Sequence, residues 1–385
     1  MNAPEPSPPP TGPTRILVRG TNWLGDAVMA TPALLRLREK FPDAHIALLT
    51  PGKLADLWLH HSAVNETLLI APDDGVFSVG SQLRAARFDL ALVLPNSPRS
   101  ALEVWLARIP RRIGYARPWR NWLLTRAITP RPGAVKMRKR SAEEIKQLIA
   151  RSPAAKSAPP GAAHPLPASA HQLHDYLGLV AALGANPEPL APQLAVTPPE
   201  VEAATKKFGL ERITRPVLGL SPGAEYGPAK RWPVDKFIAA AIEIRQRINC
   251  TWLVFGGNAD AALGRRIESA ISSPPTAVLN LAGKTNLREL MALLRRCRVL
   301  VTNDTGPMHV AAALGTPVVV PFGSTSSALT GPGLPGDPRH YLLQSDAPCS
   351  PCFLRECPID FRCMHGHAVE HVVEAVMAAA AGPER

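Results

Sequence analysis

The sequence predicts an α/β protein of two Rossmann-like, doubly wound halves that face each other across a cleft. Short apolar runs recur along the chain, and most of them end in glycine or in a small polar residue. Helical stretches separate these runs, and the alternation occurs once before and once after a proline-rich segment at residues 187–200. Strands that alternate with helices form parallel sheets with right-handed crossovers. In such folds, ligands bind outside the carboxyl ends of the strands.

Length and composition set the domain organisation. The 385 residues suit two domains, and a hydrophobic content of 46% supports packed cores. The 42 prolines cluster, which predicts loops and tails. We expect a disordered tail at 1–13 and an N-terminal half at 14–190, with a low-complexity excursion and a short helix at 136–170. A C-terminal half at 191–367 then precedes a final segment at 368–385, which is expected to contain a helix.

The first half begins with an apolar run at residues 15–20, the form of a buried parallel strand. A long helix is expected over 26–41, and further strands over 45–50 and 88–96. The second half repeats this pattern with five apolar runs, at 217–223, 251–257, 278–283, 299–304 and 317–323.

The net charge of +12 is compatible with a role in solubility alone, and also with binding to an anionic partner. No zinc-finger spacing, RNA-recognition octamer or basic-zipper pattern is present, so nucleic acid is not expected. The chain has no long apolar stretch typical of a transmembrane helix, and its first residues do not resemble a signal peptide. These features favour a cytoplasmic protein.

The first strand-to-helix junction contains Gly25 and Asp26. An aspartate at the start of a helix usually caps it, and on general grounds this interpretation is the more common one. The alternative is a general base at the carboxyl edge of the sheet. The order G-x-G-x-x-G is absent, so binding of a nicotinamide dinucleotide is disfavoured.

The second junction, SPGAEYGPAKRWP at 221–233, leaves a strand through Ser221 and Gly223 and presents Lys230. Small residues and a lysine in a loop after a strand suit a phosphate, because a lysine is a mobile point charge. The alternative is a solvated lysine beside a core tryptophan.

The third junction, TNDTGPMHVAAALGTP, starts at Thr302 and opens a helix at Thr305, Gly306 and Pro307. A proline is tolerated in the first turn, and the free N–H groups with the helix dipole form an anion site. Asp304 is suited to bind sugar hydroxyls. His309 is equally compatible with a packed core histidine and with a ligand contact. Two phosphate-suited loops in one half indicate a diphosphate ligand.

Taken together, the three junctions resemble the ADP-heptose:lipopolysaccharide heptosyltransferases, which have the GT-B glycosyltransferase fold. The resemblance spans residues 15–378, and GAEYGPAKRWP followed by TNDTGPMHVAAALGTP is most similar to the heptosyltransferase II group. It implies that 14–190 is the acceptor-binding half and 191–367 the nucleotide-sugar-binding half, and that the helix within 368–385 crosses back onto the first half. It also implies that Asp26 is the base and that Lys230 binds phosphate. The family's donor motif falls on Asp304, Thr305, Gly306 and His309, and its adenine contact near Thr285. The ribose-binding acid of related enzymes aligns with Ala259, and the neighbouring Asp260 is a substitute.

The resemblance also implies a reaction. An inverting enzyme of this kind transfers L-glycero-D-manno-heptose from ADP-heptose to the first heptose of the Kdo2-lipid A core, without a catalytic metal. It acts as a monomer, peripheral to the inner face of the cytoplasmic membrane. Within the enzyme class, heptosyltransferase I or a transferase with another acceptor is the alternative. Outside it, the alternatives are a non-catalytic nucleotide-sugar-binding protein and a zinc-stabilised interaction module.

Four arginines gather at 111–120, namely Arg111, Arg112, Arg117 and Arg120. A solvated basic loop is the common interpretation of such a run. The resemblance places this region in the acceptor half, where guanidinium groups can pair with phosphates and Kdo carboxylates.

Four cysteines, Cys349, Cys352, Cys357 and Cys363, give the spacing C-x2-C-x4-C-x5-C. In a cytosolic protein such a cluster indicates a structural zinc site or free thiols rather than disulfides. The spacing is not that of a standard finger, and free thiols are the favoured interpretation.

Overall fold

The structure is a computed structural model that describes residues 12–151, 166–271 and 277–382. The chain divides into two compact units. The first consists of Met1–Asn22, Ala30–Pro132 and Leu173–Pro189, and the second of Trp23–Met29, Gly133–Gln172 and Leu190–Arg385. Most of the tail expected at 1–13, and residues 152–165 of the excursion expected at 136–170, lie outside the described residues.

The first unit contains a six-stranded parallel sheet in the order β3-β2-β1-β4-β5-β6. Its strands are β1 (Arg15–Arg19), β2 (His45–Pro51), β3 (Glu66–Ile70), β4 (Leu90–Val93), β5 (Arg111–Tyr115) and β6 (Arg126–Ile128). Its helices are α2 (Thr31–Lys40), α3 (Val76–Ala85), α4 (Pro98–Leu106) and α6 (Leu173–Ala181), with short 3₁₀ turns at Gly52–Trp58 and Asn121–Leu123. Helices α3 and α4 pack as one pair, and α2 and α6 as another.

The core of the first unit comes from strands buried along their whole length. All four residues of β4 and four of the five in β1 are buried. Strands that are covered on both faces consist of consecutive apolar residues, so the sequence alone predicts them. At the carboxyl end of β1, Arg19 forms an almost fully buried ion pair with Glu103, with 2.8 Å between Nε and Oε2.

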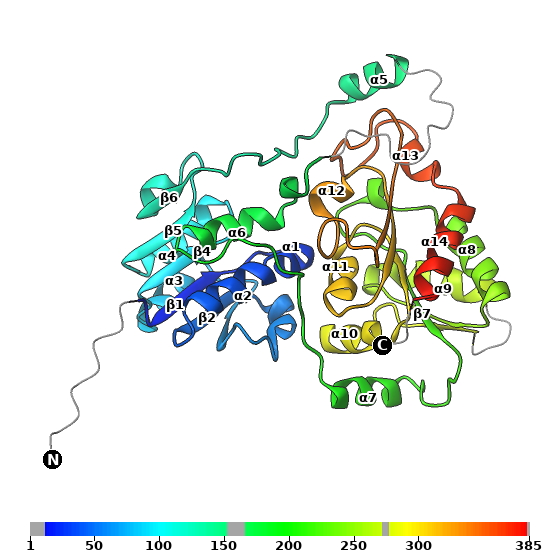
Figure 1. Cartoon of the computed structure of the whole chain (residues 1–385), viewed down its shortest axis with the longest axis horizontal. Helices are drawn as coiled ribbons and strands as arrows, with labels where there is room; N and C mark the ends of the chain where they lie inside the picture. Colours follow the sequence, from blue (N-terminus) through cyan, green and yellow to red (C-terminus); the bar gives the residue numbers. More distant parts are fainter. Residues whose placement is uncertain (1–11, 152–165, 272–276, 383–385) are drawn as a thin grey trace. The chain divides into compact units, whose positions relative to one another are not determined.

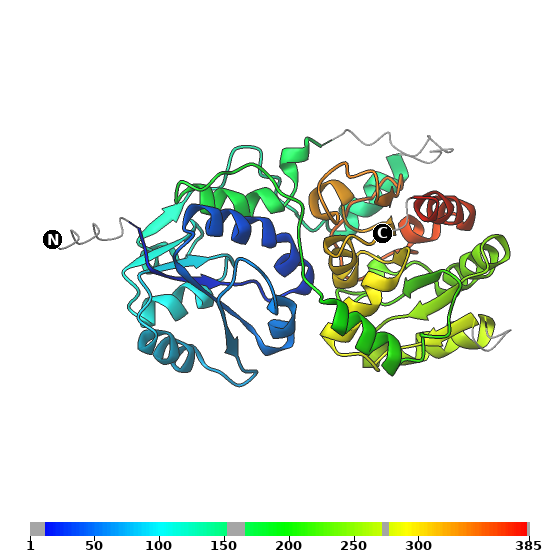
Figure 2. The ribbon, with the colours of Figure 1, turned by 60° about the horizontal axis from the view of Figure 1, so that its bottom comes forward.

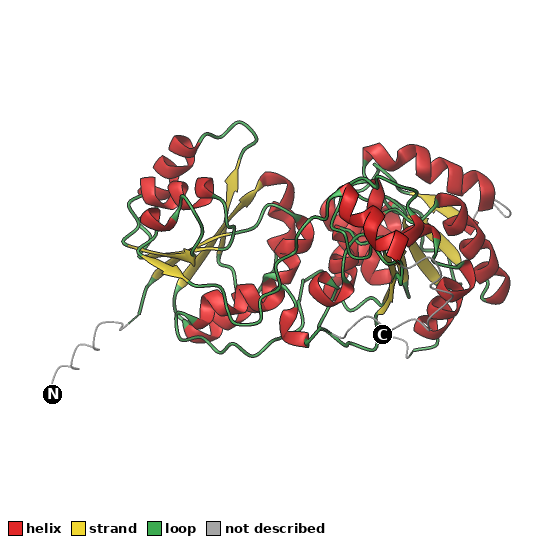
Figure 3. Ribbon diagram, turned by 90° about the horizontal axis from the view of Figure 1, so that it is seen from above, coloured by secondary structure: helices red, strands yellow, loops and turns green. Residues whose placement is uncertain are grey.

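The second unit repeats the topology, with the order β12-β11-β10-β7-β8-β9. Its strands are β7 (Val217–Ser221), β8 (Thr251–Val254), β9 (Val278–Asn280), β10 (Leu300–Thr302), β11 (Val318–Phe322) and β12 (Tyr341–Gln344), all paired in parallel. If the strands of each sheet are numbered 1 to 6 along the chain, the first sheet has the order 3-2-1-4-5-6, and the second has the same order read from its other edge. This is the strand order of dinucleotide-binding folds. The two doubly wound sheets confirm the predicted fold class. Figure 3 shows the strands of each unit flanked by helices.

The helices of the second unit form two groups, one on either side of its strands (Figure 1). One group contains α8 (Val234–Arg247), α9 (Ala261–Ile271) and α14 (Val369–Ala380), and the other contains α7 (Pro198–Lys207), α10 (Leu287–Arg296) and α11 (Gly306–Ala313). The remaining helices are α1 (Leu24–Met29), α5 (Ala142–Arg151), α12 (Ser327–Thr330) and α13 (Arg362–His365), with 3₁₀ turns at Ala168–Ala170, Pro228–Lys230 and Asn258–Asp260. None of the described helices is long and apolar enough to cross a lipid bilayer.

The final helix differs from the prediction that it crosses back onto the first half. Helix α14 packs on α8, β11 and β12 of the second unit (Figure 2). Its residues Val372, Val373 and Val376 are fully buried in the same core cluster as Trp252 of β8. Because this valine stripe completes the core of the second unit, the helix belongs to that unit.

The structure also differs from the prediction of one long helix over 26–41. This stretch forms two helices, α1 and α2, separated at Ala30, and α1 packs against α11 in the second unit while α2 remains in the first. The predicted strands do not include β3, β5, β6 and β12, which are short and whose residues are largely half-buried or charged. The basic run at 111–120, for which a solvated loop is the common interpretation, contains β5.

Candidate active site

The candidate site of the second unit lies where its strand order reverses. β7 and β10 are neighbours in the sheet, and the chain leaves them toward opposite sides. Ligands of open α/β sheets bind outside the carboxyl ends of the strands at such a switch point. The loops that follow β7 and β10 here are the two that the sequence analysis selected for phosphate, at 221–233 and 302–309.

Lys230 follows β7 at the end of a short 3₁₀ turn and is largely buried. Its Nζ lies 2.7 Å from Oδ2 of Asp304, with side-chain exposures of 14% and 5%. The ammonium group also lies over the ring of Tyr226, 4.9 Å from the ring centre. A lysine held by a carboxylate and an aromatic face is a fixed cation, not a solvated surface lysine. An ammonium group has three N–H donors, so the contact with Asp304 leaves donors for a ligand.

The loop after β7 is held in place by the segment around Phe353. Tyr226 donates its hydroxyl hydrogen to the carbonyl of Phe353 at 3.0 Å, and Arg355 donates to the carbonyl of Tyr226 at 2.6 Å. Gly227 has a φ of +156°, and a Cβ there would lie 2.4 Å from the carbonyl oxygen of Arg355. Only glycine fits this close approach. These contacts fix the position of Lys230.

The loop after β10 is anchored by Asn303. Its side-chain amide donates to the carbonyl of Pro222 at 2.7 Å, and its Oδ1 accepts from the backbone N–H of Trp232 at 2.9 Å. Asn303 therefore ties the two loops of the switch point together. Asp304, the next residue, receives a hydrogen bond from the hydroxyl of Thr325 and the ion pair from Lys230.

Helix α11 begins at Gly306, with Thr305 as an extended N-cap residue that makes no side-chain capping bond and with Pro307 in the first turn. Its first N–H groups and the helix dipole favour an anion at this end. His309 lies one turn inside the helix and is 5% exposed. Burial, together with the nearby charges of His171 and Lys230, lowers the pKa of His309 to about 4, although Asp304 opposes this. The imidazole is therefore neutral at neutral pH.

Helix α1 packs closely on α11, and two glycines permit it. A Cβ on Gly25 would lie 2.7 Å from Cδ2 of His309, and a Cβ on Gly306 would lie 2.7 Å from Cδ2 of Leu24. Contacts below 3 Å force neighbouring atoms to shift. The two glycines thus bring α1, with Asp26, next to the start of α11.

Asp26 is the third residue of α1 and not the residue before it, so it does not occupy the N-cap position. Its Oδ1 accepts a hydrogen bond of 2.7 Å from the side-chain amide of Gln172. Gln172 is itself held by a backbone hydrogen bond to Leu329. Sequence reasoning missed Gln172, because nothing in its own segment marks it and the contact spans 146 residues.

These groups line one cavity of about 400 Å³. The predicted residues that line it are Asp26, Lys230, Asp304, Thr305, Gly306 and His309. Residues that the sequence analysis did not select also line it, among them Gln172, Met137, Lys139 and Phe353. The cavity combines a fixed cation, a helix N-terminus and a carboxylate, which suits a diphosphate and a hydroxyl nucleophile.

Three predicted donor residues do not line this cavity, namely Ser221, Gly223 and Thr285. Ser221 is 2% exposed at the end of β7. Gly223 lies against the carboxylate of Asp260, since a Cβ there would come within 2.5 Å of it. That carboxylate accepts the N–H of Gly257 at 3.0 Å. Donor binding by Ser221, Gly223 and Thr285, and ribose binding by Asp260, stay predictions.

The four arginines predicted to bind the acceptor lie in β5 or in the loop that follows it. Arg111 and Arg112 are at its amino end, and Arg112 donates to the carbonyls of Leu123 and Ile109. Arg120 is fully buried and donates to the carbonyl of Pro95 at 2.6 Å, and burial lowers its pKa to about 10, with a smaller effect from Arg117. Arg117 follows the carboxyl end of β5 and is half-buried. Acceptor binding by the four stays a prediction, and the position of Arg117 suits it best.

The four cysteines lie in the segment that follows β12 and carry free thiols, three of them buried. Burial is the main cause that raises the pKa of Cys363, to about 12, and the other three cysteines add to it, so the four lie near one another. Within residues 12–151, 166–271 and 277–382, no group of three or more histidine, cysteine or acidic side chains is arranged to hold a metal ion. The structural zinc site stays a prediction.

The chain is similar to known proteins in both sequence and fold. Residues 157–361 match the family model for glycosyltransferase family 9 (heptosyltransferase). The lipopolysaccharide heptosyltransferase 2 of Salmonella typhimurium is 34% identical over 83% of this chain and 85% of that protein, and the Escherichia coli protein of the same name is 32% identical over the same shares. The solved structure of Escherichia coli ADP-heptose lipopolysaccharide heptosyltransferase II superposes with a TM-score of 0.73 at 28% identity, covering 95% of this chain and 98% of that one.

Proposed function

The chain belongs to glycosyltransferase family 9, the heptosyltransferases, and from this premise we propose that it is a lipopolysaccharide heptosyltransferase II. It transfers L-glycero-D-manno-heptose from ADP-heptose to the first heptose of the Kdo2-lipid A core, with inversion at the anomeric carbon. The observation that carries the proposal is the cavity in which Asp26, Lys230 and the start of α11 meet. The names of the relatives supply the donor and acceptor classes.

Asp26 is the general base of the proposed reaction. Its carboxylate takes the proton from the acceptor hydroxyl while the oxygen attacks the anomeric carbon of the donor. Gln172 donates to Oδ1 of Asp26 at 2.7 Å, which orients a carboxylate that lines the cavity. Gln172 is thus a positioning residue.

Lys230 and the first N–H groups of α11 stabilise the ADP leaving group. Negative charge grows on the diphosphate as the glycosidic bond breaks, and fixed donors aimed at that charge lower the barrier. Asp304 keeps Lys230 in place through its 2.7 Å ion pair. The neutral His309 supports the packing of α1 on α11 without adding charge.

The enzyme acts in the cytoplasm as a monomer, on the inner face of the membrane that holds its lipid acceptor. The net charge of +12 supports this placement, because anionic lipids attract basic proteins. The arginines after β5, above all Arg117, bind the acidic groups of the acceptor.

The test is a transfer assay with ADP-heptose and two acceptors, heptosyl-Kdo2-lipid A and Kdo2-lipid A, with products identified by mass spectrometry. Addition of one heptose to the first acceptor alone supports the proposal. Addition to Kdo2-lipid A alone would make the protein a heptosyltransferase I. Tight ADP binding without transfer to either acceptor would support a non-catalytic nucleotide-sugar-binding protein.

A further inference from the structure

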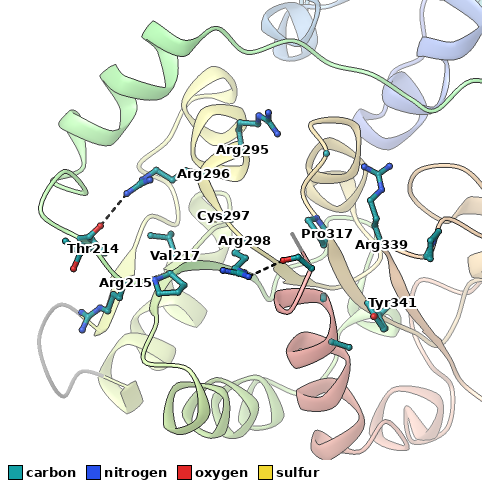
Figure 4. Close-up of a pocket in the computed structure, with 17 residues that line it drawn as sticks. Thr214, Arg215, Val217, Arg295, Arg296, Cys297, Arg298, Pro317, Arg339 and Tyr341 are labelled. Atoms are coloured by element: carbon teal, nitrogen blue, oxygen red, sulfur yellow. Dashed lines mark hydrogen bonds between the residues drawn. The ribbon is translucent and has the colours of Figure 1, made fainter. Parts of the chain in front are cut away.

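A second cavity of the second unit lies at the opposite edge of its sheet from the candidate active site. It has a volume of about 680 Å³ and is lined by residues at the amino ends of four strands, including Val217, Arg298, Pro317 and Tyr341 (Figure 4). β7 runs from Val217 at this edge to Ser221 at the other, which separates the two edges by roughly 13 Å. The cavity is therefore distinct from the site around Lys230.

The lining of this cavity is strongly basic. Five of the described residues that line it are arginines, and none of the other described lining residues is an aspartate or a glutamate. The arginines come from four segments of the chain: the approach to β7 (Arg215), the last turn of α10 (Arg295 and Arg296), the approach to β10 (Arg298) and the loop before β12 (Arg339).

Three guanidinium groups of this set donate hydrogen bonds to neutral backbone carbonyls. Arg298 donates to the carbonyls of Ala380 and Gly382, at 2.5 and 3.2 Å. Arg295 donates to the carbonyl of Leu314 at 3.1 Å, and Arg296 to that of Ile213 at 3.5 Å. Both of these arginines are exposed, and among the described residues neither has a carboxylate partner. Since a guanidinium group carries five N–H donors, each keeps most of its donors for a ligand.

A purely structural role explains only part of this arrangement. Arginines in the last turn of a helix interact favourably with its dipole, which accounts for Arg295 and Arg296 on α10. The helix dipole does not account for Arg215, Arg298 and Arg339, which also line the cavity. Arg215 donates to the hydroxyl of Thr251 at 2.6 Å, which is not a charged partner. Arg339 is paired with Asp337, but that carboxylate does not line the cavity.

We propose that this cavity binds a ligand with at least two phosphate charges. Arginine recognises phosphate through paired, charge-assisted hydrogen bonds, and the volume is within the range of small-molecule sites. The same chemistry has two sources, a soluble diphosphate and the head groups of anionic phospholipids. The site does not depend on the proposed transferase reaction, because no described residue lines both this cavity and the candidate active site.

The test compares the unmodified full chain with Arg295→Gln/Arg296→Gln. The matched control is Arg265→Gln/Arg266→Gln, which removes the same charge from two exposed arginines on α9. Calorimetry with pyrophosphate forms the first arm. We expect Arg295→Gln/Arg296→Gln to weaken one binding step at least about tenfold, because two charge-assisted contacts are lost. The control and Lys230→Ala should both retain that step.

Flotation with phosphatidylcholine vesicles, with and without phosphatidylglycerol, forms the second arm. A loss of vesicle binding that is specific to Arg295→Gln/Arg296→Gln assigns the ligand to lipid head groups. A loss confined to pyrophosphate binding assigns it to a soluble diphosphate. If the variant matches the control in both arms, or if Lys230→Ala alone abolishes all pyrophosphate binding, the proposal is overturned.

Discussion

The pairing of Lys230 with Asp304 makes a quantitative prediction about ADP binding. Nζ of Lys230 lies 2.7 Å from Oδ2 of Asp304, and the carboxylate is only 5% exposed. A phosphate oxygen bound by the same ammonium would lie about 5 Å from that carboxylate. At an effective dielectric constant of about 20, two unit negative charges at this distance repel by about 3 kcal/mol. The ammonium group of Lys230 offsets this repulsion.

Lys230→Ala should therefore lose more than one hydrogen bond. The charge-assisted bond itself contributes about 1.5–3 kcal/mol, and the repulsion from Asp304 is no longer offset. Together these effects predict ADP binding weakened by roughly 100-fold or more, since 1.4 kcal/mol is a factor of ten. Isothermal titration calorimetry with ADP measures this change directly.

A double variant separates the two effects. In the Lys230→Ala background, Asp304→Asn removes the uncompensated carboxylate and should recover about tenfold or more of the lost ADP affinity. Circular dichroism of each variant checks that the fold is intact. The reasoning is refuted if Lys230→Ala binds ADP within about threefold of the unmodified protein, or if Asp304→Asn gives no recovery in that background.

Four further predictions concern the same unit. Asp26→Asn should lower kcat by at least about 100-fold, the lower end for loss of a general base, with ADP affinity nearly unchanged; near-normal turnover in steady-state assays would assign Asp26 a structural role only. Gly25→Ala should destabilise the protein by about 1–3 kcal/mol, because its Cβ meets the buried ring of His309 at 2.7 Å; an unchanged urea midpoint would count against the α1–α11 contact. The pKa of His309 is lowered from 6.5 to about 4, so between these pH values the unfolded chain binds the extra proton. The free energy of unfolding should therefore fall as the pH falls through this window, and less steeply for His309→Gln in pH-dependent urea titrations. Transfer should persist in chelator, since Lys230 and the start of α11 supply positive charge to the leaving diphosphate; activity lost in chelator and restored by magnesium, with the fold intact, would contradict this mechanism.

The sequence alone was enough to predict the two doubly wound sheets and two loops of the site. The buried strands β1, β4, β7 and β11 are continuous apolar runs, and such runs are local signals. Lys230 lies in the loop after β7, and the Asp304–Thr305–Gly306 turn comes just after β10. Their place at the carboxyl edge of a parallel sheet therefore follows from the strand pattern. Strands with half-buried or charged residues, such as β5 and β12, gave no such signal.

The tertiary structure decided which groups meet. Lys230 and Asp304 pair because β7 and β10 are neighbours in the sheet, although 74 positions separate the two residues in the chain. Asp26 joins them because Gly25 and Gly306 let α1 pack closely on α11, and Gln172 reaches Asp26 from a segment with no pattern of its own. The arginines that line the second cavity likewise come from four segments of the chain. Local sequence determines the strands and turns. Contacts between distant segments depend on the order of the strands in each sheet and on glycines, which have no side chain and let helices pack closely.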